Sequence, residues 1–292
     1  MKDKRTYKVD DDYFKRWSHD MAYILGFWFT DGCISKENSL FTITQNKKEN
    51  KLMRHILSAM RSNYPLKFYR DFCRFDIRSK NIIEDIVQLG GKERKSLDVK
   101  FPFVPKKYIQ DFVRGLWDGD GYVGNTKNRK SYHSSFSGGS KSFVESLLAL
   151  LRDNITELNG AIKIDIRKRG TKSSDGRIRR LDHTCYNIVF GPNDTRRLRD
   201  FIYSTPSKLR MERKYVKFCN SGKIKVAQKY LTFKESRQFV SKLGIRTQKE
   251  WQKYSKENRP LVIPSNPSRT YKRSGWSDWK DWLSGQLSQE II

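Results

Sequence analysis

The sequence contains the same unusual segment twice. Each copy is an apolar, helix-like run that ends in Asp-Gly, with a glycine five residues before the final acid. The copies cover residues 24–32 and 113–121, so their acids, Asp31 and Asp120, lie 89 positions apart. A chain that repeats a helix with an acid at a fixed place is expected to fold as an internal duplication with two related halves.

The position of each acid is energetically unfavourable. The C-terminal end of a helix carries partial negative charge, so a carboxylate there costs about 0.3–1 kcal/mol. The glycine that follows is an ordinary helix stop, because glycine adopts the left-handed conformation at little cost. Two such acids in a basic chain predict that something positive lies against both, and a hard cation such as Mg²⁺ suits carboxylate oxygens. The alternative is that Asp-Gly is only a turn signal.

The two segments resemble the paired motifs of LAGLIDADG homing endonucleases, with Asp31 and Asp120 at the positions of the catalytic acids. The basic segments 94–96 and 213–215 are similar to those that follow each half-domain in that family. The resemblance extends over roughly residues 15–220. It implies two motif helices packed side by side, with Gly26 and Gly115 at their interface because small residues let the backbones approach closely.

The order of elements after each motif supports a duplicated α+β fold. In the first half we expect strands at 40–45 and 74–78 and helices at 50–57 and 81–87. In the second half we expect strands at 132–137, 162–167 and 186–190, a helix at 143–151, and a helix from an Asp194 N-cap to 202. The family resemblance implies αββαββα half-domains related by a pseudo-twofold, whose antiparallel sheets form a DNA-binding saddle. The expected domains are residues 1–104, 105–222 and 223–292.

The resemblance also implies a mechanism and further site residues. Asp31 and Asp120 would each bind Mg²⁺ for hydrolysis of one DNA strand. Mn²⁺ is expected to substitute, and Ca²⁺ to bind without supporting cleavage. Lys95 and Lys214 match the basic active-site positions, although Lys92 and Lys208 could take their place. Gln45 ends a strand where a water-positioning residue is expected. Its counterpart falls near Gly138, which has no side chain and puts symmetric use of Gln45 in doubt.

Net charge and strand patterning indicate a nucleic-acid partner. The chain has 60 Lys+Arg against 32 Asp+Glu, a net charge of +28, and a protein this basic usually binds a polyanion. Alternating strands with mixed polar and charged faces suit reading of base edges, although such faces are often only solvated. The residues that we expect to contact DNA are Ser35, Lys36, Thr42, Thr44, Arg74, Asp76, Arg78, Arg129, His133, Ser135, Lys163, Asp165, Arg167 and Asn187.

Composition argues against several other classes. No run of about 18 apolar residues exists, and the N-terminal segment lacks the apolar stretch of a secretory signal. The four cysteines form no CxxC pair and the four histidines no cluster, so we expect reduced thiols and neither zinc nor histidine-based nuclease chemistry. A cytoplasmic location in a prokaryotic or phage context is expected, or the organelle matrix if the chain is organelle-encoded.

Residues 223–292 form a third region with a different composition. They hold 15 Lys+Arg and 6 Asp+Glu, and four of the seven tryptophans. Short helices are expected at 233–243 and 248–254, and Trp276, Trp279 and Trp282 at helical intervals are expected to build a small core, whereas the role of Trp251 is open. The region resembles a tryptophan-rich repeat of some phage-type integrases. We interpret it as a mainly helical DNA-binding appendage; the alternative is a packing extension.

The sequence therefore predicts a site-specific, Mg²⁺-dependent endonuclease that cuts both DNA strands across the minor groove. With both halves in one chain, it is expected to act as a monomer on a long asymmetric site. Two alternatives use the same fold: an intron RNA maturase, and a non-catalytic DNA-binding regulator. Retention of both Asp31 and Asp120 argues against the regulator.

Overall fold

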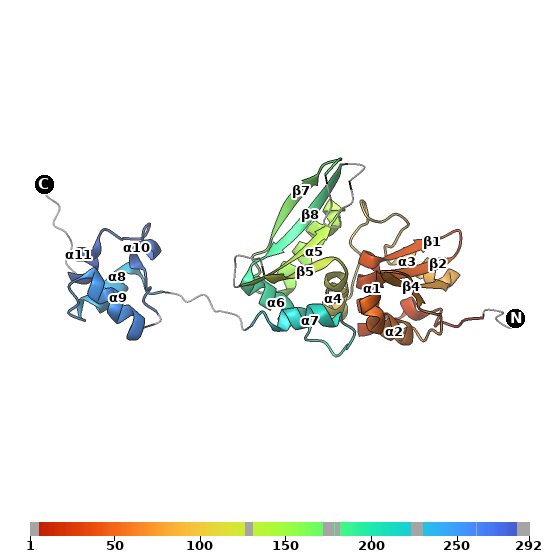
Figure 1. Cartoon of the computed structure of the whole chain (residues 1–292), viewed down its shortest axis with the longest axis horizontal. Coiled ribbons are helices and arrows are strands. Elements are labelled where there is room, and N and C mark those ends of the chain that lie inside the picture. Colours follow the sequence, from red (N-terminus) through yellow and green to blue (C-terminus); the bar gives the residue numbers. More distant parts are fainter. Residues whose placement is uncertain are drawn as a thin grey trace. The chain divides into compact units, whose positions relative to one another are not determined.

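The computed structural model describes residues 6–125, 131–171, 178, 182–222, 230–260 and 262–284. The chain divides into two compact units, Met1–Ile224 and Lys225–Ile292 (Figure 1). None of the helices in the described part of the chain is both long enough and apolar enough to cross a membrane.

The first half of the larger unit follows the expected αββαββα order. A 3₁₀ turn, Tyr13–Lys15, precedes it, and a second one, Lys47–Glu49, leads into its second helix. Its elements are α1 (His19–Asp31), β1 (Gly32–Ser35), β2 (Leu40–Asn46), α2 (Asn50–Ala59), β3 (Lys67–Phe68), β4 (Phe72–Arg78) and α3 (Lys80–Gln88).

The second half repeats that order after a 3₁₀ turn at Lys106–Tyr108. Its elements are α4 (Ile109–Asp120), β5 (Gly121–Asn125), β6 (Tyr132–Gly138), α5 (Lys141–Asn154), β7 (Ala161–Arg167), β8 (His183–Phe190) and α6 (Pro192–Ile202), followed by α7 (Glu212–Cys219). The expected Asp194 N-cap is wrong. The helix begins two residues earlier, at Pro192, with Gly191 as its cap, because proline is pre-organised for the first helical position.

The two four-stranded antiparallel sheets have the same topology. The strand orders are β1-β2-β4-β3 and β5-β6-β8-β7, and the fold is α+β as predicted. In the first sheet Phe41, Ile43 and Phe75 are fully buried, and the alternate residues face the other way. In the second sheet the outer strand β7 is less covered, since Ile164 and Ile166 are 62% and 65% exposed.

The centre of the larger unit is the contact between α1 and α4, which lie side by side (Figure 1). A Cβ built on Gly26 would overlap the carbonyl oxygen of Phe112, and one built on Gly115 would overlap that of Tyr23. The duplication places Tyr23 where Phe112 stands, so the two contacts are reciprocal. Reciprocity is the mark of a two-fold interface, and the two helices therefore meet with pseudo-twofold symmetry.

The smaller unit is a set of short helices: α8 (Phe233–Ser241), α9 (Gln248–Glu257), α10 (Pro267–Thr270) and α11 (Trp279–Ser284). Complete capping boxes begin α8 and α9, at Thr232 and Thr247. The core residues are Val240, Trp251, Ile263, Tyr271, Trp282 and Leu283. Of the three tryptophans expected to build this core, only Trp282 is buried; the other two pack at its edge, and Trp251 supplies the second buried indole.

The glycine contacts predict a large effect of a single methyl group. Gly26→Ala should destabilise the protein by about 3 kcal/mol or more, because the new Cβ meets helix backbone that cannot move alone. Gly191→Ala is the matched control, since an added Cβ there meets nothing within 4 Å. Urea unfolding of both variants checks this. Equal stability of the two would contradict close backbone packing between α1 and α4.

Candidate active site and nucleic-acid interface

The two motif acids are brought together where α1 and α4 end. A Cβ built on Gly119, in the last turn of α4, would overlap the Thr30 hydroxyl and lie 2.8 Å from Asp31 Oδ2. Asp31 is half-buried, and part of the Asp120 side chain reaches solvent. Each acid is the last residue of its helix and is followed directly by a strand. The site therefore sits at the junction of helices and sheets in both halves.

The glycines after the acids have a role that differs from the expected left-handed helix stop. Gly32 and Gly121 are both extended, with φ of −102° and −76°. A Cβ on either would overlap the ring of the tryptophan four residues earlier, Trp28 or Trp117. These positions need glycine because a buried indole occupies the space of a side chain, and the chain can then turn straight into β1 or β5.

Lys214 supplies positive charge at the end of α4. Its buried Nζ donates to the carbonyl oxygens of Trp117 at 2.9 Å, Asp118 at 2.7 Å and Gly119 at 2.9 Å. All three carbonyls belong to the last helical turn, where few backbone donors remain; that of Trp117 also accepts from the Gly121 amide. Burial lowers the pKa of Lys214 to about 8, against the opposing effect of the nearby acids. The lysine thus offsets both the helix dipole and the carboxylate next to it.

Lys95 has the corresponding place at the end of α1. Its Nζ is buried, donates to the Gly32 carbonyl, and lies 5.0 Å from the centre of the Trp28 ring. Burial lowers its pKa, while Asp120 and Asp31 act in the opposite direction. The positive charge expected against the acids is therefore present in the chain itself. Of the two substitutes considered, Lys92 pairs with Asp98 at 2.6 Å and Lys208 is exposed.

The surroundings of the two acids oppose their ionisation, chiefly through burial. Burial and then the negative charge of Asp120 raise the pKa of Asp31 to about 7, while Lys214, Lys95 and a hydrogen bond from Gln45 lower it. Desolvation also raises the pKa of Asp120, although its side chain is partly exposed. Carboxylates in this state are poised to accept a cation, which would relieve the repulsion between them.

A divalent cation fits this donor set. Mg²⁺ is usually held by one or two carboxylates, with water and substrate phosphate completing the shell, so Asp31 and Asp120 would suffice. Within the described ranges there is no group of three or more His, Cys, Asp or Glu side chains that could hold a metal by themselves. The site therefore suits a cation shared with a phosphate ligand better than a closed structural metal site.

Gln45 is a predicted polar residue that hydrogen-bonds to a motif acid. It lies near the end of β2, and its Nε2 donates to Asp31 Oδ2 at 3.1 Å. Strand register identifies its counterpart: Gly32 pairs with Ile43 in the first sheet, and Gly121 pairs with Phe136 in the second. Two residues further along each strand stand Gln45 and Gly138. The sequence-based match of these two positions is thus repeated in the register.

Asp118 is an important residue that the sequence did not reveal. Its carboxylate is 1% exposed and accepts from the Tyr23 hydroxyl at 2.8 Å and from the Met211 amide at 2.7 Å. It therefore ties α4 to α1 and to the start of α7, which carries Lys214. Burial raises its pKa to about 6. The sequence could have pointed to Asp118 because it lies inside the repeated motif, at the position where the first copy has Phe29.

A second missed contact joins the two halves beside the site. Arg213 Nε donates to Glu49 Oε1 at 2.6 Å, and Glu49 is buried in the turn before α2. Arg213 precedes Lys214 on α7. The ion pair therefore holds the lysine-bearing helix against the first half. The basic segment 213–215 was visible in the sequence, but Glu49, the acidic partner of Arg213, lies far away along the chain.

On the first sheet, the predicted DNA-contacting residues form a charged network. Asp76 accepts from Arg74 Nε at 2.7 Å, from the Thr42 hydroxyl at 2.8 Å and from Lys67 Nζ at 3.2 Å. Burial opposes ionisation of Asp76, but these hydrogen bonds hold its pKa below the ordinary value. Thr42 is 3% exposed, so its role is to fix Asp76. The remaining predicted residues of this sheet are at least partly accessible: Ser35, Lys36, Thr44 and Arg78.

On the second sheet, the predicted residues are more scattered. His133 packs against Tyr122, with ring centres 5.4 Å apart, and the Ser137 hydroxyl donates to Asn187 Oδ1. Lys163 and Asp165 are exposed on the outer strand β7, and Ser135 is half-buried on β6. Arg129 lies outside the described residues, as does the side chain of Arg167.

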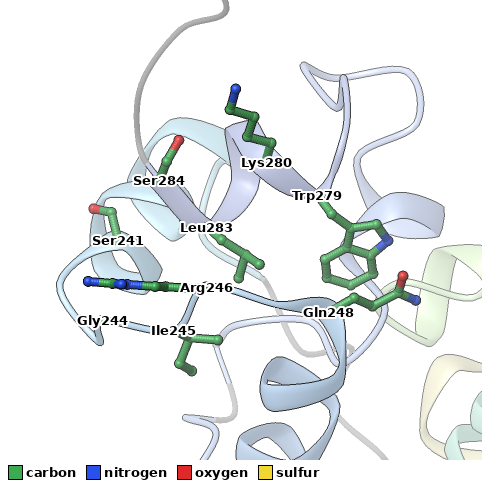
Figure 2. A pocket seen from close by; sticks show the side chains of 9 residues that line it. All are labelled: Ser241, Gly244, Ile245, Arg246, Gln248, Trp279, Lys280, Leu283 and Ser284. Carbon is green, nitrogen blue, oxygen red and sulfur yellow. The ribbon is translucent and has the colours of Figure 1, made fainter.

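The smaller unit has its own hollow surface, a pocket of about 450 Å³ between the α8–α9 turn and α11 (Figure 2). Trp279 lies toward one end of it and Arg246 toward the other (Figure 2). The pocket is lined by Ser241, Gly244, Ile245, Arg246, Gln248, Trp279, Lys280, Leu283 and Ser284. This lining contains two exposed cations and no acid.

Comparison with known proteins identifies part of this architecture. Residues 107–200, from the start of α4 into α6, match the model of the LAGLIDADG-like domain. The chain therefore contains a LAGLIDADG-like domain. A probable translation initiation factor IF-2 of Methanocaldococcus jannaschii is 30% identical over 145 residues, which are 46% of this chain. The match covers 12% of that relative's length.

Solved structures with distant similarity include two DNA complexes. One is the homing endonuclease I-WcaI bound to its DNA recognition sequence, with a TM-score of 0.45, 15% identity, and coverage of 71% of this chain and 90% of that one. Another is an I-DmoI variant with its target DNA in the presence of magnesium, with a TM-score of 0.41, 16% identity, and coverage of 64% and 97%.

The raised pKa of Asp31 predicts a pH-dependent stability. The folded protein keeps a proton on Asp31 that the unfolded chain loses near pH 4, so its stability falls as the pH rises from about 4 to 7. Asp31→Asn should remove this loss and make the metal-free protein more stable at pH 8, by on the order of 1 kcal/mol. Urea unfolding across pH in the presence of EDTA measures it.

Asp76→Asn is the control for that experiment, because the pKa of Asp76 is shifted the other way. Its ionised form stabilises the fold above its ordinary pKa, and this stabilisation is lost as the pH falls. The Asp76 variant should therefore be less stable than the parent protein at neutral pH. An Asp31→Asn protein that is also less stable at pH 8 would contradict the raised pKa of Asp31.

Proposed function

We propose that this protein is a site-specific endonuclease that cuts both strands of double-stranded DNA by metal-assisted phosphodiester hydrolysis. The observation that supports it most is the pair of carboxylates, Asp31 and Asp120, at converging helix ends with a buried lysine beside each helix terminus. The LAGLIDADG-like domain and the net charge of +28 point to the same class of activity.

The chain's own residues account for binding and positioning at the scissile phosphates. Asp31 and Asp120 would hold the divalent cation, Mg²⁺ or Mn²⁺, which when bound activates water and neutralises developing charge. Lys95 and Lys214 hold positive charge at the two helix ends, where it would attract a scissile phosphate through space, since the three N–H donors of Lys214 already go to carbonyl oxygens. Gln45 fixes the orientation of the Asp31 carboxylate. One acid for each strand explains why the motif occurs twice.

The polar sheet faces are proposed to bind the DNA duplex on either side of the acids. The Asp76 network offers both donors and an acceptor, and such mixed groups can read base edges in the major groove. The second sheet presents a different set of side chains, so the two halves would read different sequences. A single chain is therefore expected to act as a monomer on a long asymmetric site.

Substitution of either acid tests this proposal. Asp31→Asn or Asp120→Asn should abolish double-strand cleavage while DNA binding persists or tightens, because a negative charge near the phosphates is removed. Selection of cut sites from a DNA library with Mg²⁺, followed by gel assays of the variants, measures both properties. Asp153→Asn, an exposed acid on α5 outside the predicted DNA-binding residues, is the charge-matched control and should still cut.

The outcomes also separate the alternatives. Cleavage of both strands at the normal rate by either acid variant would refute the assignment of the catalytic acids. Specific DNA binding by the parent protein without cleavage in any divalent metal would favour a DNA-binding regulator. Binding of structured intron RNA in preference to DNA would favour a maturase.

We further propose that the smaller unit binds nucleic acid through the pocket of Figure 2. Most acids of the described part of this unit are committed internally. Glu235 and Glu250 close the two capping boxes, and Asp281 pairs with Arg237. Arg246 and Lys280 remain exposed in the pocket lining; Lys280 follows the half-buried Trp279 in the chain, and Arg246 lies toward the other end of the pocket. Exposed cations beside an aromatic ring are a common arrangement for binding phosphate and base together.

Charge reversal tests the role of this pocket. The double variant Arg246→Glu with Lys280→Glu should weaken DNA binding and lower the slope of log K against log salt by about 0.9 for each lost phosphate contact. Its control, Arg269→Glu with Lys253→Glu, changes net charge equally at exposed positions that do not line the pocket. A chain that ends at Ile224 lacks the smaller unit and gives the affinity and salt slope expected when its whole contribution is lost. If both double variants and the truncated chain bound DNA with the affinity and salt slope of the parent protein, the smaller unit would be a packing extension.

A further inference from the structure

The two acids do not have equivalent surroundings. Beside Asp31, the Gln45 amide fills the space at the end of β2 and donates to the carboxylate at 3.1 Å. Beside Asp120, the matching strand position is Gly138, which has nothing to donate. The two acids also differ in solvent exposure: Asp31 is half-buried, whereas Asp120 is exposed.

A pocket of about 280 Å³ lies where the second half lacks this side chain. It is lined by Asp120 and Gly138, by Lys95 and Ser96 from the first half, and by Ser137 and Cys185 from the second sheet, among others. Val144 is not part of this lining, but it limits the space at Gly138: a Cβ built on Gly138 would come 2.8 Å from Val144 Cγ2. Asp120 therefore faces a polar space large enough for several water molecules.

We infer that Gln45 is a positioning residue for only one of the two acids, and that the two DNA strands are consequently cut at unequal rates, with the strand served by Asp31 cut first. This inference rests on the proposed endonuclease function. A carboxylate held by a hydrogen bond is restricted to one orientation, whereas Asp120 must be ordered by its ligands at each turnover. A nicked duplex should therefore accumulate during the reaction.

Strand-resolved kinetics test the inference. With the two strands labelled separately, Gln45→Met should slow only the faster strand, by about tenfold, because it keeps the side-chain volume but removes the donor. The slower strand should be unaffected, and the nicked intermediate should diminish. A residue with a merely structural role would slow both strands together. DNA affinity in Ca²⁺, where cleavage is not expected, should stay unchanged.

Transfer of the amide to the other half is the reciprocal experiment. Gly138→Gln combined with Val144→Ala, which makes room for the new side chain, should speed up the slower strand relative to Val144→Ala alone. A readout independent of cleavage accompanies it. The glutamine should fill the pocket and slow alkylation of Cys185 by a small maleimide, measured by mass spectrometry against the Val144→Ala background.

The results distinguish this inference from the function on which it rests. Equal rates for both strands in the parent protein, with cleavage still abolished by Asp31→Asn, would overturn the inference and leave the endonuclease function standing. Slowing of both strands by Gln45→Met would also overturn it. Protection of Cys185 without any change in the slower strand would show that the missing amide does not limit the Asp120 side. Failure to cut any DNA would remove both proposals.

Discussion

The close packing of α1 against α4 is the contact on which the rest of the larger unit depends. Gly26 and Gly115 let each helix touch the backbone of the other, and their reciprocal contacts impose pseudo-twofold symmetry on both halves. Because Asp31 and Asp120 end these helices, the same contact brings two carboxylates together. It also places a sheet on each side of the pair. A change at this interface would therefore alter the fold and the site at once.

Bringing two acids to the negative ends of two helices is costly, and the surrounding structure compensates for it. Lys214 donates to three terminal carbonyls of α4, and Lys95 donates to the residue after α1. Asp118 and the Glu49–Arg213 ion pair then hold α7, and with it Lys214, in place. The compensation is incomplete, since the pKa of Asp31 stays near 7. Burial is the main cause and the negative charge of Asp120 adds to it; a bound cation would offset both effects.

The duplication is faithful in its backbone and uneven in its side chains. Element order, sheet topology and strand register agree between the halves. Gln45 corresponds to Gly138, and Phe29 corresponds to Asp118. The Asp76 network of the first sheet has as its counterpart a looser set of polar groups on the second. Two halves with the same backbone and different side chains suit recognition and cleavage of an asymmetric duplex, which is the function that we propose.

The sequence alone indicated the duplication and most of the helices and strands, because each is encoded by local periodicity or by a motif that occurs twice. The complete αββαββα order, with the short strands β1, β3 and β5, and the glycines at the helix interface were implied by the family resemblance. The sequence also predicted that positive charge must lie near the acids, and it matched Gln45 with Gly138. Only the tertiary structure decided that buried lysines supply this charge, that Gly32 and Gly121 make room for indole rings, and that Trp251 is a core residue. The hydrogen bonds of Asp118 to Tyr23 and Met211 and the pocket beside Asp120 join residues that are distant in the chain, so no local sequence pattern predicts them.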